Sequence, residues 1–252
     1  MKQNYKIEGE GRCIVFIHGL SDNLIYWQPL VNKLKKHCQI LRYDLRGHGL
    51  SGIDEKKITM NVYEKDLLNL LDKLDLKEVN LVGFSLGGNI ALDFAIKHPN
   101  RVSSITLMST FYKCDKHLSE VFRLLKQSLK RSFIEFYDMI LPMVLCPNII
   151  DKYEEELSLM KIEASKTANT NAYIQALDVC LNFDVEDKLG CINVPTLIFA
   201  GKYDEMISLS IQKQLHSKIE KSEMIILSNV KHNLLVGENV GKIGEILKGY
   251  VL

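Results

Sequence analysis

Short apolar runs alternate with amphipathic helical patterns along most of the chain. Cys13 to Ile17 is continuously apolar, as expected for a strand that is covered on both faces. Apolar residues recur at helical spacing over 24–36, behind the capping cluster 21–23, and again over 59–74. Further strands are predicted at 40–43, 79–82 and 104–108, with a weak one within 5–11. The alternation indicates an α/β protein with a mostly parallel central sheet, flanked by helices and built by right-handed crossovers.

The pattern changes in the middle of the chain. From 111 to 183 it is helical, with no convincing strand and with breaks expected at Pro142 and Pro147. The alternation then resumes, with elements expected at 194–201, 208–219, 224–227 and 238–250. We therefore divide the chain into an α/β core, 1–110 and 184–252, and an all-helical cap, 111–183. The cap should cover the carboxyl edge of the sheet, where open α/β folds bind ligands.

One short stretch joins a predicted strand to a predicted helix with a serine at the tip of the turn. It is Gly83-Phe84-Ser85-Leu86-Gly87. In such an elbow the serine has strained backbone geometry, and the residues two before and two after it come very close together. Glycine at both places therefore has a steric reason. The flanking strand and helix predict that Ser85 is a nucleophile.

A serine hydroxyl attacks well only when a base takes its proton and a third group orients the base. Asp204 and His232 each come just after a predicted strand, so both should lie at the edge of the sheet to which Ser85 points. We predict that His232 is the base and Asp204 the orienting acid. Asp184 and Asp187 precede a strand instead, which places them at the wrong edge.

Several motifs together make the chain recognisable. They are His18-Gly19, the loop Asp44-Leu45-Arg46-Gly47-His48-Gly49-Leu50-Ser51, the serine elbow, Val194-Pro195-Thr196, Gly201-Lys202-Tyr203-Asp204 and His232. Over nearly its whole length the chain resembles α/β-hydrolases of the small capped esterase and lactonase type, such as acyl-carrier methyl ester esterases and enol-lactonases. The resemblance implies an α/β-hydrolase fold, a Ser-His-Asp triad, no cofactor, and an oxyanion hole made by the backbone N–H groups of Leu20 and Leu86. One such donor is typically worth about 3 kcal/mol.

Two positions depart from the pattern of the family. Ser208 stands where proline is common, and it could instead cap the following helix. Lys231 stands where glycine usually precedes the catalytic histidine, which leaves the path of that loop open.

The function expected from these residues is hydrolysis of carboxylic esters with small to medium acyl chains, through an acyl-enzyme intermediate. A lactonase, an acyl-carrier methyl ester esterase and a carbon–carbon bond hydrolase remain open on the same scaffold. A ligand-binding receptor without turnover is the alternative from another class.

Other residues favour plainer interpretations. The stretch 47–52 matches the dinucleotide fingerprint, but 53–57 intervenes before any helix, so we do not interpret it as a cofactor site. His18 and His48 are expected to hold loops near the site, and Trp27 to pack its helix. No His-Glu-x-x-His and no clustered Cys/His spacing occurs, so no metal is expected.

The cap carries two features that stay open. One set of residues could line an acyl pocket or form the cap's own core: Phe133, Phe136, Tyr137, Met139 and Met143. A second set would share one helical face and be either a solvated surface or a docking site for an acidic acyl carrier: Arg123, Lys126, Lys130 and Arg131.

Composition adds limits on partners and location. The formal net charge is +1, so neither nucleic acid nor an anionic membrane is expected as the main partner, and the substrate should be a small ester or lactone. The N-terminus lacks the apolar region of a signal peptide, and no apolar run has the length of a membrane span. The six cysteines are scattered, as in a protein of a reducing compartment, so we expect the cytoplasm.

Overall fold

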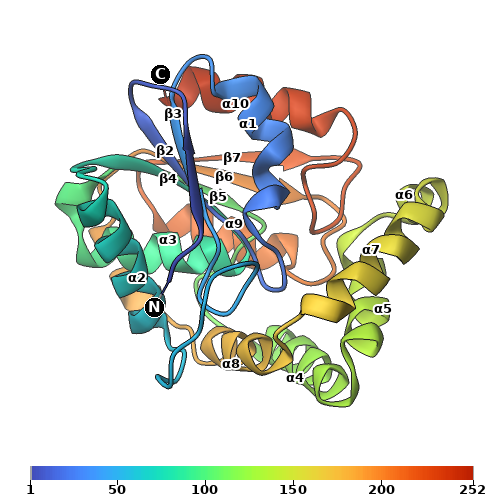
Figure 1. Ribbon diagram of the computed structural model, residues 1–252. Helices are drawn as coiled ribbons and strands as arrows, with labels where there is room; N and C mark the ends of the chain where they lie inside the picture. The colour runs from blue at the N-terminus through green and yellow to red at the C-terminus, as the bar shows by residue number, and fades with distance from the viewer. Residues whose placement is uncertain (1, 252) are drawn as a thin grey trace.

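A seven-stranded sheet forms the centre of the computed structural model, which describes residues 2–251 (Figure 1). The strand order is β1-β3-β2-β4-β5-β6-β7, and only β1 pairs antiparallel with its neighbour. The strands are β1 (Tyr5–Glu8), β2 (Cys13–Ile17), β3 (Gln39–Tyr43), β4 (Val79–Phe84), β5 (Val102–Met108), β6 (Thr196–Gly201) and β7 (Ser222–Leu227). The predicted mostly parallel sheet is confirmed.

Helices cover both faces of this sheet. The helical elements outside the cap are η1 (Leu24–Trp27), α1 (Gln28–Leu34), α2 (Met60–Lys73), α3 (Leu86–Lys97), η2 (Pro99–Arg101), η3 (Glu186–Cys191), α9 (Leu209–Lys218) and α10 (Asn239–Val251). Alternate residues of β2 point to opposite faces: Ile14 and Phe16 pack with α1 and α10, whereas Val15 and Ile17 pack with α2, α3 and α9. Both faces of the sheet are therefore buried, which explains why β2 is apolar at every position.

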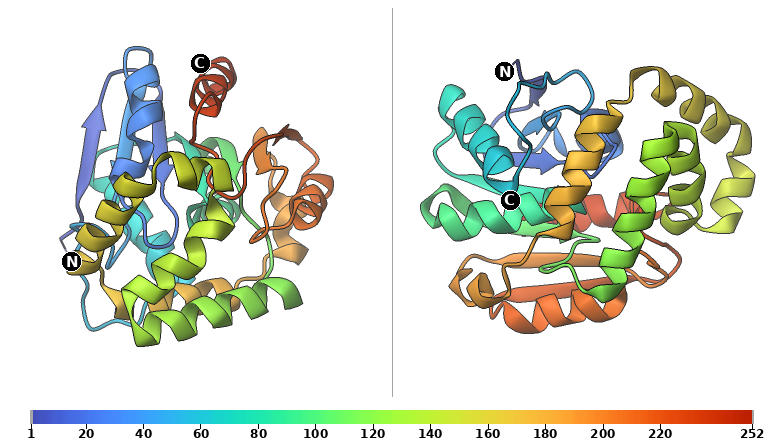
Figure 2. Two further views of the ribbon diagram at one scale, coloured as in Figure 1. Left: turned by 90° about the vertical axis from the view of Figure 1, so that its right-hand side faces the viewer. Right: turned by 90° about the horizontal axis from the view of Figure 1, so that it is seen from below.

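Five helices lie between β5 and β6 in the chain, over the range predicted for the cap. They are α4 (Lys116–Arg131), α5 (Phe133–Val144), α6 (Pro147–Lys152), α7 (Glu154–Thr167) and α8 (Thr170–Leu181). An isolated bridge between Lys113 and Asp184 ties the two ends of this segment together. The helix α4 packs against both α5 and α8, and the right-hand view of Figure 2 shows how these helices cross. That 111–183 forms a cap domain distinct from the α/β core stays a prediction.

Two local expectations were wrong. The helix expected over 24–36 begins as the 3₁₀ turn η1, because Pro29 in the first turn of α1 has no N–H to continue an α-helical ladder from η1. Pro142 does not break a helix but lies inside the last turn of α5, whereas Pro147 begins α6 as expected. None of the helices within residues 2–251 is both long enough and apolar enough to cross a membrane.

Candidate active site

Ser85 occupies the tight turn between β4 and α3, with φ of 51° and ψ of −116°. This is the strained geometry expected of an elbow serine. A Cβ at Gly83 would lie 2.3 Å from the carbonyl oxygen of Gly87, and a Cβ at Gly87 would lie 2.0 Å from that of Ile17. Only glycine fits at either place, so the steric reason inferred from the motif is correct.

Hydrogen bonds from β5 and the residues after it hold the elbow. The N–H of Ser85 donates to the carbonyl oxygen of Met108 over 2.9 Å, and Thr110 Oγ1 donates to the carbonyl oxygen of Ser85 over 2.7 Å. The strained backbone is thus held at both its N–H and its carbonyl oxygen by β5 and the segment that follows it, which keeps Ser85 at a fixed place.

His232 and Asp204 come together at the same edge of the sheet. His232 Nδ1 lies 2.8 Å from Asp204 Oδ2, and both side chains are buried. The other oxygen of Asp204, Oδ1, accepts the N–H groups of Met206 and Ile207 over 3.0 and 2.8 Å. Because the carboxylate accepts from Nδ1–H, Nε2 is the ring nitrogen that can take a proton from a nucleophile.

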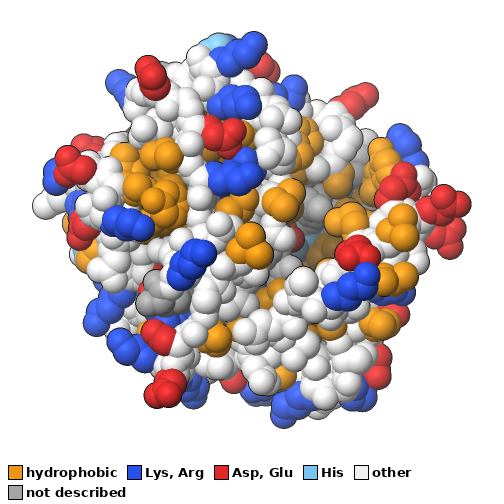
Figure 3. All heavy atoms as spheres, viewed as in Figure 1, with side chains coloured by type: hydrophobic (Ala, Val, Ile, Leu, Met, Phe, Trp, Pro, Cys, Tyr) orange, Lys and Arg blue, Asp and Glu red, His pale blue; other side chains and the backbone are white. Residues whose placement is uncertain are grey.

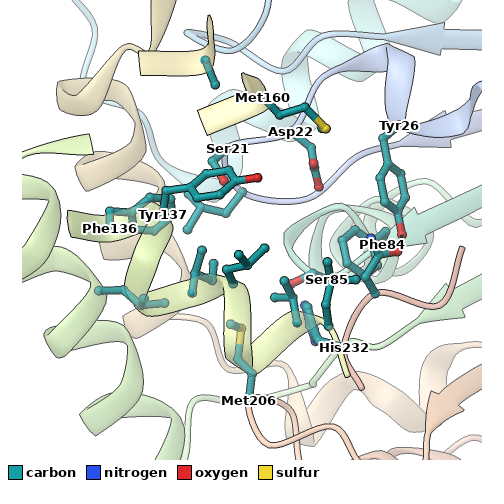
Figure 4. Close-up of a pocket in the computed structure, with 18 of the residues that line it drawn as sticks. Ser21, Asp22, Tyr26, Phe84, Ser85, Phe136, Tyr137, Met160, Met206 and His232 are labelled. Atoms are coloured by element: carbon teal, nitrogen blue, oxygen red, sulfur yellow. Dashed lines mark hydrogen bonds between the residues drawn. The ribbon is translucent and has the colours of Figure 1, made fainter. Parts of the chain in front are cut away.

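A cavity of about 280 Å³ lies between the sheet edge and the cap helices. Ser85 and His232 both line it, and Figure 4 shows them next to each other on one wall. The ring of Phe84, the residue before Ser85, lies 5.0 Å from the imidazole of His232, which places the base close to the elbow. Figure 3 shows a hollow between core and cap, with hydrophobic side chains gathered on the cap beside it.

The two predicted oxyanion donors are Leu20 and Leu86. Leu20 lines the cavity, and Leu86 is the first residue of α3, where a helix offers its N–H no acceptor. The positive end of the α3 dipole adds to the attraction for a negative oxygen at this point. Their role as oxyanion donors stays a prediction.

The cap contributes most of the apolar wall. Phe133, Phe136 and Tyr137 line the cavity, whereas Met139 and Met143 pack against the main core cluster and do not line it. Sequence reasoning missed wall residues from three loops and from the helices η1 and α7: Asp22, Tyr26, Met160, Met206 and Asn233. Position next to Leu20 or to His232 was the one signal that could have found Asp22 and Asn233.

The remaining candidates are structural, as expected. His18 Nε2 accepts the N–H of Leu45 over 2.9 Å, and burial lowers the pKa of His18 to about 4. Burial also lowers the pKa of His48, to about 3, and its Nδ1 lies 3.0 Å from the carbonyl oxygen of Arg46. Trp27 is fully buried and stacks on Phe16.

Both departures from the family pattern have visible roles. Ser208 Oγ accepts the N–H of Ile211 at the start of α9, as a capping serine should. Lys231 Nζ donates to the carbonyl oxygen of Pro142 over 2.8 Å and pairs with Glu205 over 3.0 Å. The lysine before His232 therefore connects that loop to α5 of the cap.

The groups at this site are those that nucleophilic chemistry uses. Within residues 2–251 no three His, Cys, Asp or Glu side chains are grouped so as to hold a metal ion. A serine in a strained elbow, an oriented imidazole and free N–H groups are the parts that acyl transfer requires.

The chain is similar to several known proteins. A sequence model of the family described as alpha/beta hydrolase fold matches residues 12–142, more than half of the chain. A protein named as a carbamate hydrolase, RutD of Azorhizobium caulinodans, is 28% identical over 209 residues, 81% of this chain and 77% of that protein. A second relative, 3-oxoadipate enol-lactonase 1 of Acinetobacter baylyi, is 27% identical over 241 residues, 95% of this chain and 88% of that protein. The solved enol-lactonase from Burkholderia xenovorans LB400 matches with a TM-score of 0.90 at 23% identity, over 98% of this chain and 95% of that one.

Proposed function

Because the chain belongs to the α/β-hydrolase fold family, we propose that it is a serine hydrolase that cleaves carboxylic esters with small to medium acyl chains. The observation that carries this proposal is the buried hydrogen bond between His232 and Asp204, together with the position of His232 in the wall of the same cavity as Ser85. A cavity of about 280 Å³ lined by apolar cap residues suits an acyl chain of that size.

The proposed reaction proceeds in two halves. Ser85 Oγ attacks the acyl carbon, its proton passes to His232 Nε2, and the carbonyl oxygen becomes negative between the N–H groups of Leu20 and Leu86. His232 then gives the proton to the departing alcohol, leaving an acyl group on Ser85. Water attacks that acyl group with His232 as base, which releases the acid and restores the serine. Asp204 keeps the imidazole in the required tautomer throughout.

A lactonase is the second candidate, because a relative named as an enol-lactonase is 27% identical over 95% of this chain. A lactone is a cyclic ester, so the same residues would act and the alcohol would stay attached to the product. The relative named as a carbamate hydrolase extends the candidates to a carbonyl that bears nitrogen. All three reactions need the same attack on an acyl carbon.

An acidic acyl carrier remains a weaker proposal. Lys126, one of the four basic residues expected to receive it, pairs with Asp178 inside the cap, and Arg131 at the end of α4 pairs with Glu135 in the first turn of α5. Half of the predicted basic face is therefore already engaged within the chain.

The test is a panel of chromogenic esters of graded acyl length, offered to the wild type and to Ser85→Ala. We expect loss of kcat by roughly four to six orders of magnitude in Ser85→Ala. Ser158→Ala on the exposed side of α7 is the matched control and should retain full activity. Turnover that survives in Ser85→Ala would place the active site elsewhere, and turnover in neither protein would favour the receptor.

A further inference from the structure

One acidic side chain extends into the cavity. Asp22, in the loop after β2, lies between Tyr137 on one side and Tyr26 on the other (Figure 4). Among the described residues that line the cavity it is the only aspartate, glutamate, lysine or arginine. Most of the remaining wall is apolar or aromatic, so this carboxyl dominates the charge of the space that a substrate would fill.

The carboxylate of Asp22 has no hydrogen-bonding partner within the described part of the chain. It forms no ion pair and accepts no hydrogen bond there. The neighbouring Asn23 does the capping, because its side chain accepts the N–H of Ile25 over 2.8 Å at the start of η1. The capping cluster expected at 21–23 is thus divided between a residue that caps and a residue that faces the cavity.

Burial without a partner raises the pKa of Asp22 to about 7, and the nearby His232 partly opposes this rise. Burial and the charge of Asp22 raise the pKa of Tyr26 well above its ordinary value, and burial raises that of Tyr173 to about 12. Neither phenol therefore ionises near neutral pH. Asp44, the other carboxylate near this loop, is occupied by the N–H groups of Leu24 and Leu50 and by the amide of Asn4.

A lone carboxylate at this place destabilises the negative oxygen of the proposed intermediate. The negative oxygen of the intermediate would form at the N–H of Leu20, only two residues before Asp22, and like charges in a space of low dielectric repel strongly. A positive group on the substrate would cancel the charge of Asp22 and remove that repulsion. Tyr26 and Tyr137 line the same cavity as this carboxyl, and aromatic rings are groups that attract ammonium ions.

We propose that Asp22 selects esters that carry an ammonium group in the acyl chain and disfavours esters that carry a carboxylate there. This inference rests on the proposed function, because it names the class of ester that the same site hydrolyses. Asp22 acts on the substrate directly, and it takes no part in the proton transfers assigned to His232.

The test compares three para-nitrophenyl esters that share a leaving group. Their acyl chains end in a trimethylammonium group, in its uncharged tert-butyl isostere, or in a carboxylate of similar length. At about pH 8 the wild type should prefer the cationic ester over the neutral one by about tenfold or more in kcat/KM, and the anionic ester should be the poorest. Asp22→Asn should reduce the preference for the cation to near unity. Asp151→Asn, the same change on the exposed surface of α6, should leave it unaltered.

The pH dependence of the same ratio separates Asp22 from the catalytic base. Protonation of His232 slows both esters alike, so it cancels when the two rates are divided. The cation-to-neutral ratio should rise as pH rises through about 7 in the wild type, because the carboxylate forms there, and stay flat in Asp22→Asn. A ratio that Asp22→Asn leaves unchanged at all pH values overturns the inference while the proposed function stands.

A binding experiment covers the case in which no ester is turned over. The methylamides of the cationic and neutral acids are titrated by NMR into Ser85→Ala and into Ser85→Ala with Asp22→Asn. Tighter binding of the cationic amide, lost with Asp22→Asn, supports the inference even if the proposed function fails. Equal affinities in both proteins overturn it.

Discussion

The sheet and the cap meet at one cavity, but they are built in different ways. Ten of the twelve residues of α3 are buried, and every residue of β2 and β4 is buried. In α7 none of the fourteen residues is buried, and Leu159 and Met160 are 64% and 59% exposed. Ser85 thus stands on the most deeply buried part of the molecule, and the apolar walls of the cavity stand largely on the part that is exposed and can adapt. Changes in the sheet should abolish chemistry or folding, whereas changes in the cap should alter only local order or selectivity.

Among the changes that test this contrast, the largest effect is expected for Asp204→Asn. The amide cannot hold the imidazole of His232 in the tautomer that leaves Nε2 free, so kcat should fall by about 10⁴-fold. Steady-state kinetics on a chromogenic ester measures this loss, and thermal unfolding checks that the variant is folded. Asp187→Asn, at the residue excluded by its place before β6, should keep wild-type activity. Comparable losses in both variants would contradict the assignment of the acid.

Gly87→Ala should damage folding more than any substitution in the cap. The added Cβ would lie 2.0 Å from the carbonyl oxygen of Ile17, so β2 and the elbow must separate. We expect a loss of about 3–5 kcal/mol in the free energy of unfolding, measured by urea denaturation. Gly249→Ala is the matched control on α10, where a Cβ meets nothing within 4 Å, and it should be neutral or stabilising by up to about 1 kcal/mol.

Acid should weaken the core through its buried histidines. The pKa values of His18 and His48 in the folded protein are about 4 and about 3, against about 6.5 in an unfolded chain. Below about pH 6.5 the unfolded chain binds more protons than the folded one, so the free energy of unfolding falls as the pH falls, by about 3 kcal/mol for His18 and about 5 kcal/mol for His48 once the pH lies below their folded pKa values. Asp22, whose pKa is raised to about 7, has the opposite effect. As the pH falls from about 7 to about 4, its protonation in the folded protein increases the free energy of unfolding.

Comparison of variants isolates the contribution of the histidines. His48→Gln should show a smaller loss of stability than the wild type when urea unfolding is repeated at about pH 7 and about pH 5. His37→Gln, at an exposed position after α1, should reproduce the wild-type slope. Equal slopes in all three proteins would mean that His48 is not held neutral by the core.

The smallest effect is expected in the cap. Tyr137 on α5 donates a hydrogen bond from its hydroxyl to the carbonyl oxygen of Leu157 on α7, over 3.2 Å. Tyr137→Phe should speed hydrogen exchange of the α7 amides about fivefold and leave α3 and global stability unchanged, because one partly buried bond is worth about 1 kcal/mol. Tyr153→Phe, at a partly exposed ring, is the control. Faster exchange in α3 as well would show that cap and sheet open together.

What the sequence predicted follows the same division. The strands of the core were predictable because a sheet buried on both faces demands apolar residues throughout, as in Cys13 to Ile17. The positions of Asp204 and His232 follow from where parallel strands end, and the structure brings these two side chains into contact. Their catalytic roles, with that of Ser85, stay predictions.

The cap was less predictable, because its helices carry apolar residues on more than one face and tertiary packing decides which face lines the cavity. Met139 and Met143 pack away from the cavity that Phe133 and Tyr137 line, although all lie on α5. Asp22 carried a plausible local role as a cap, and only the placement of Asn23 shows that this role was already taken.

The lysine at position 231 has a consequence for how large substrates are handled. Its ammonium donates a hydrogen bond to the carbonyl oxygen of Pro142, and the N–H of Asn233 donates one to the carbonyl oxygen of Val144 over 3.0 Å. The last turn of α5 is therefore hydrogen-bonded to the residues on both sides of His232. A substrate too bulky for the space beneath α5 would push that helix outward and displace His232 with it. The size of the substrate would then change the position of the ring nitrogen that we propose accepts the proton of Ser85.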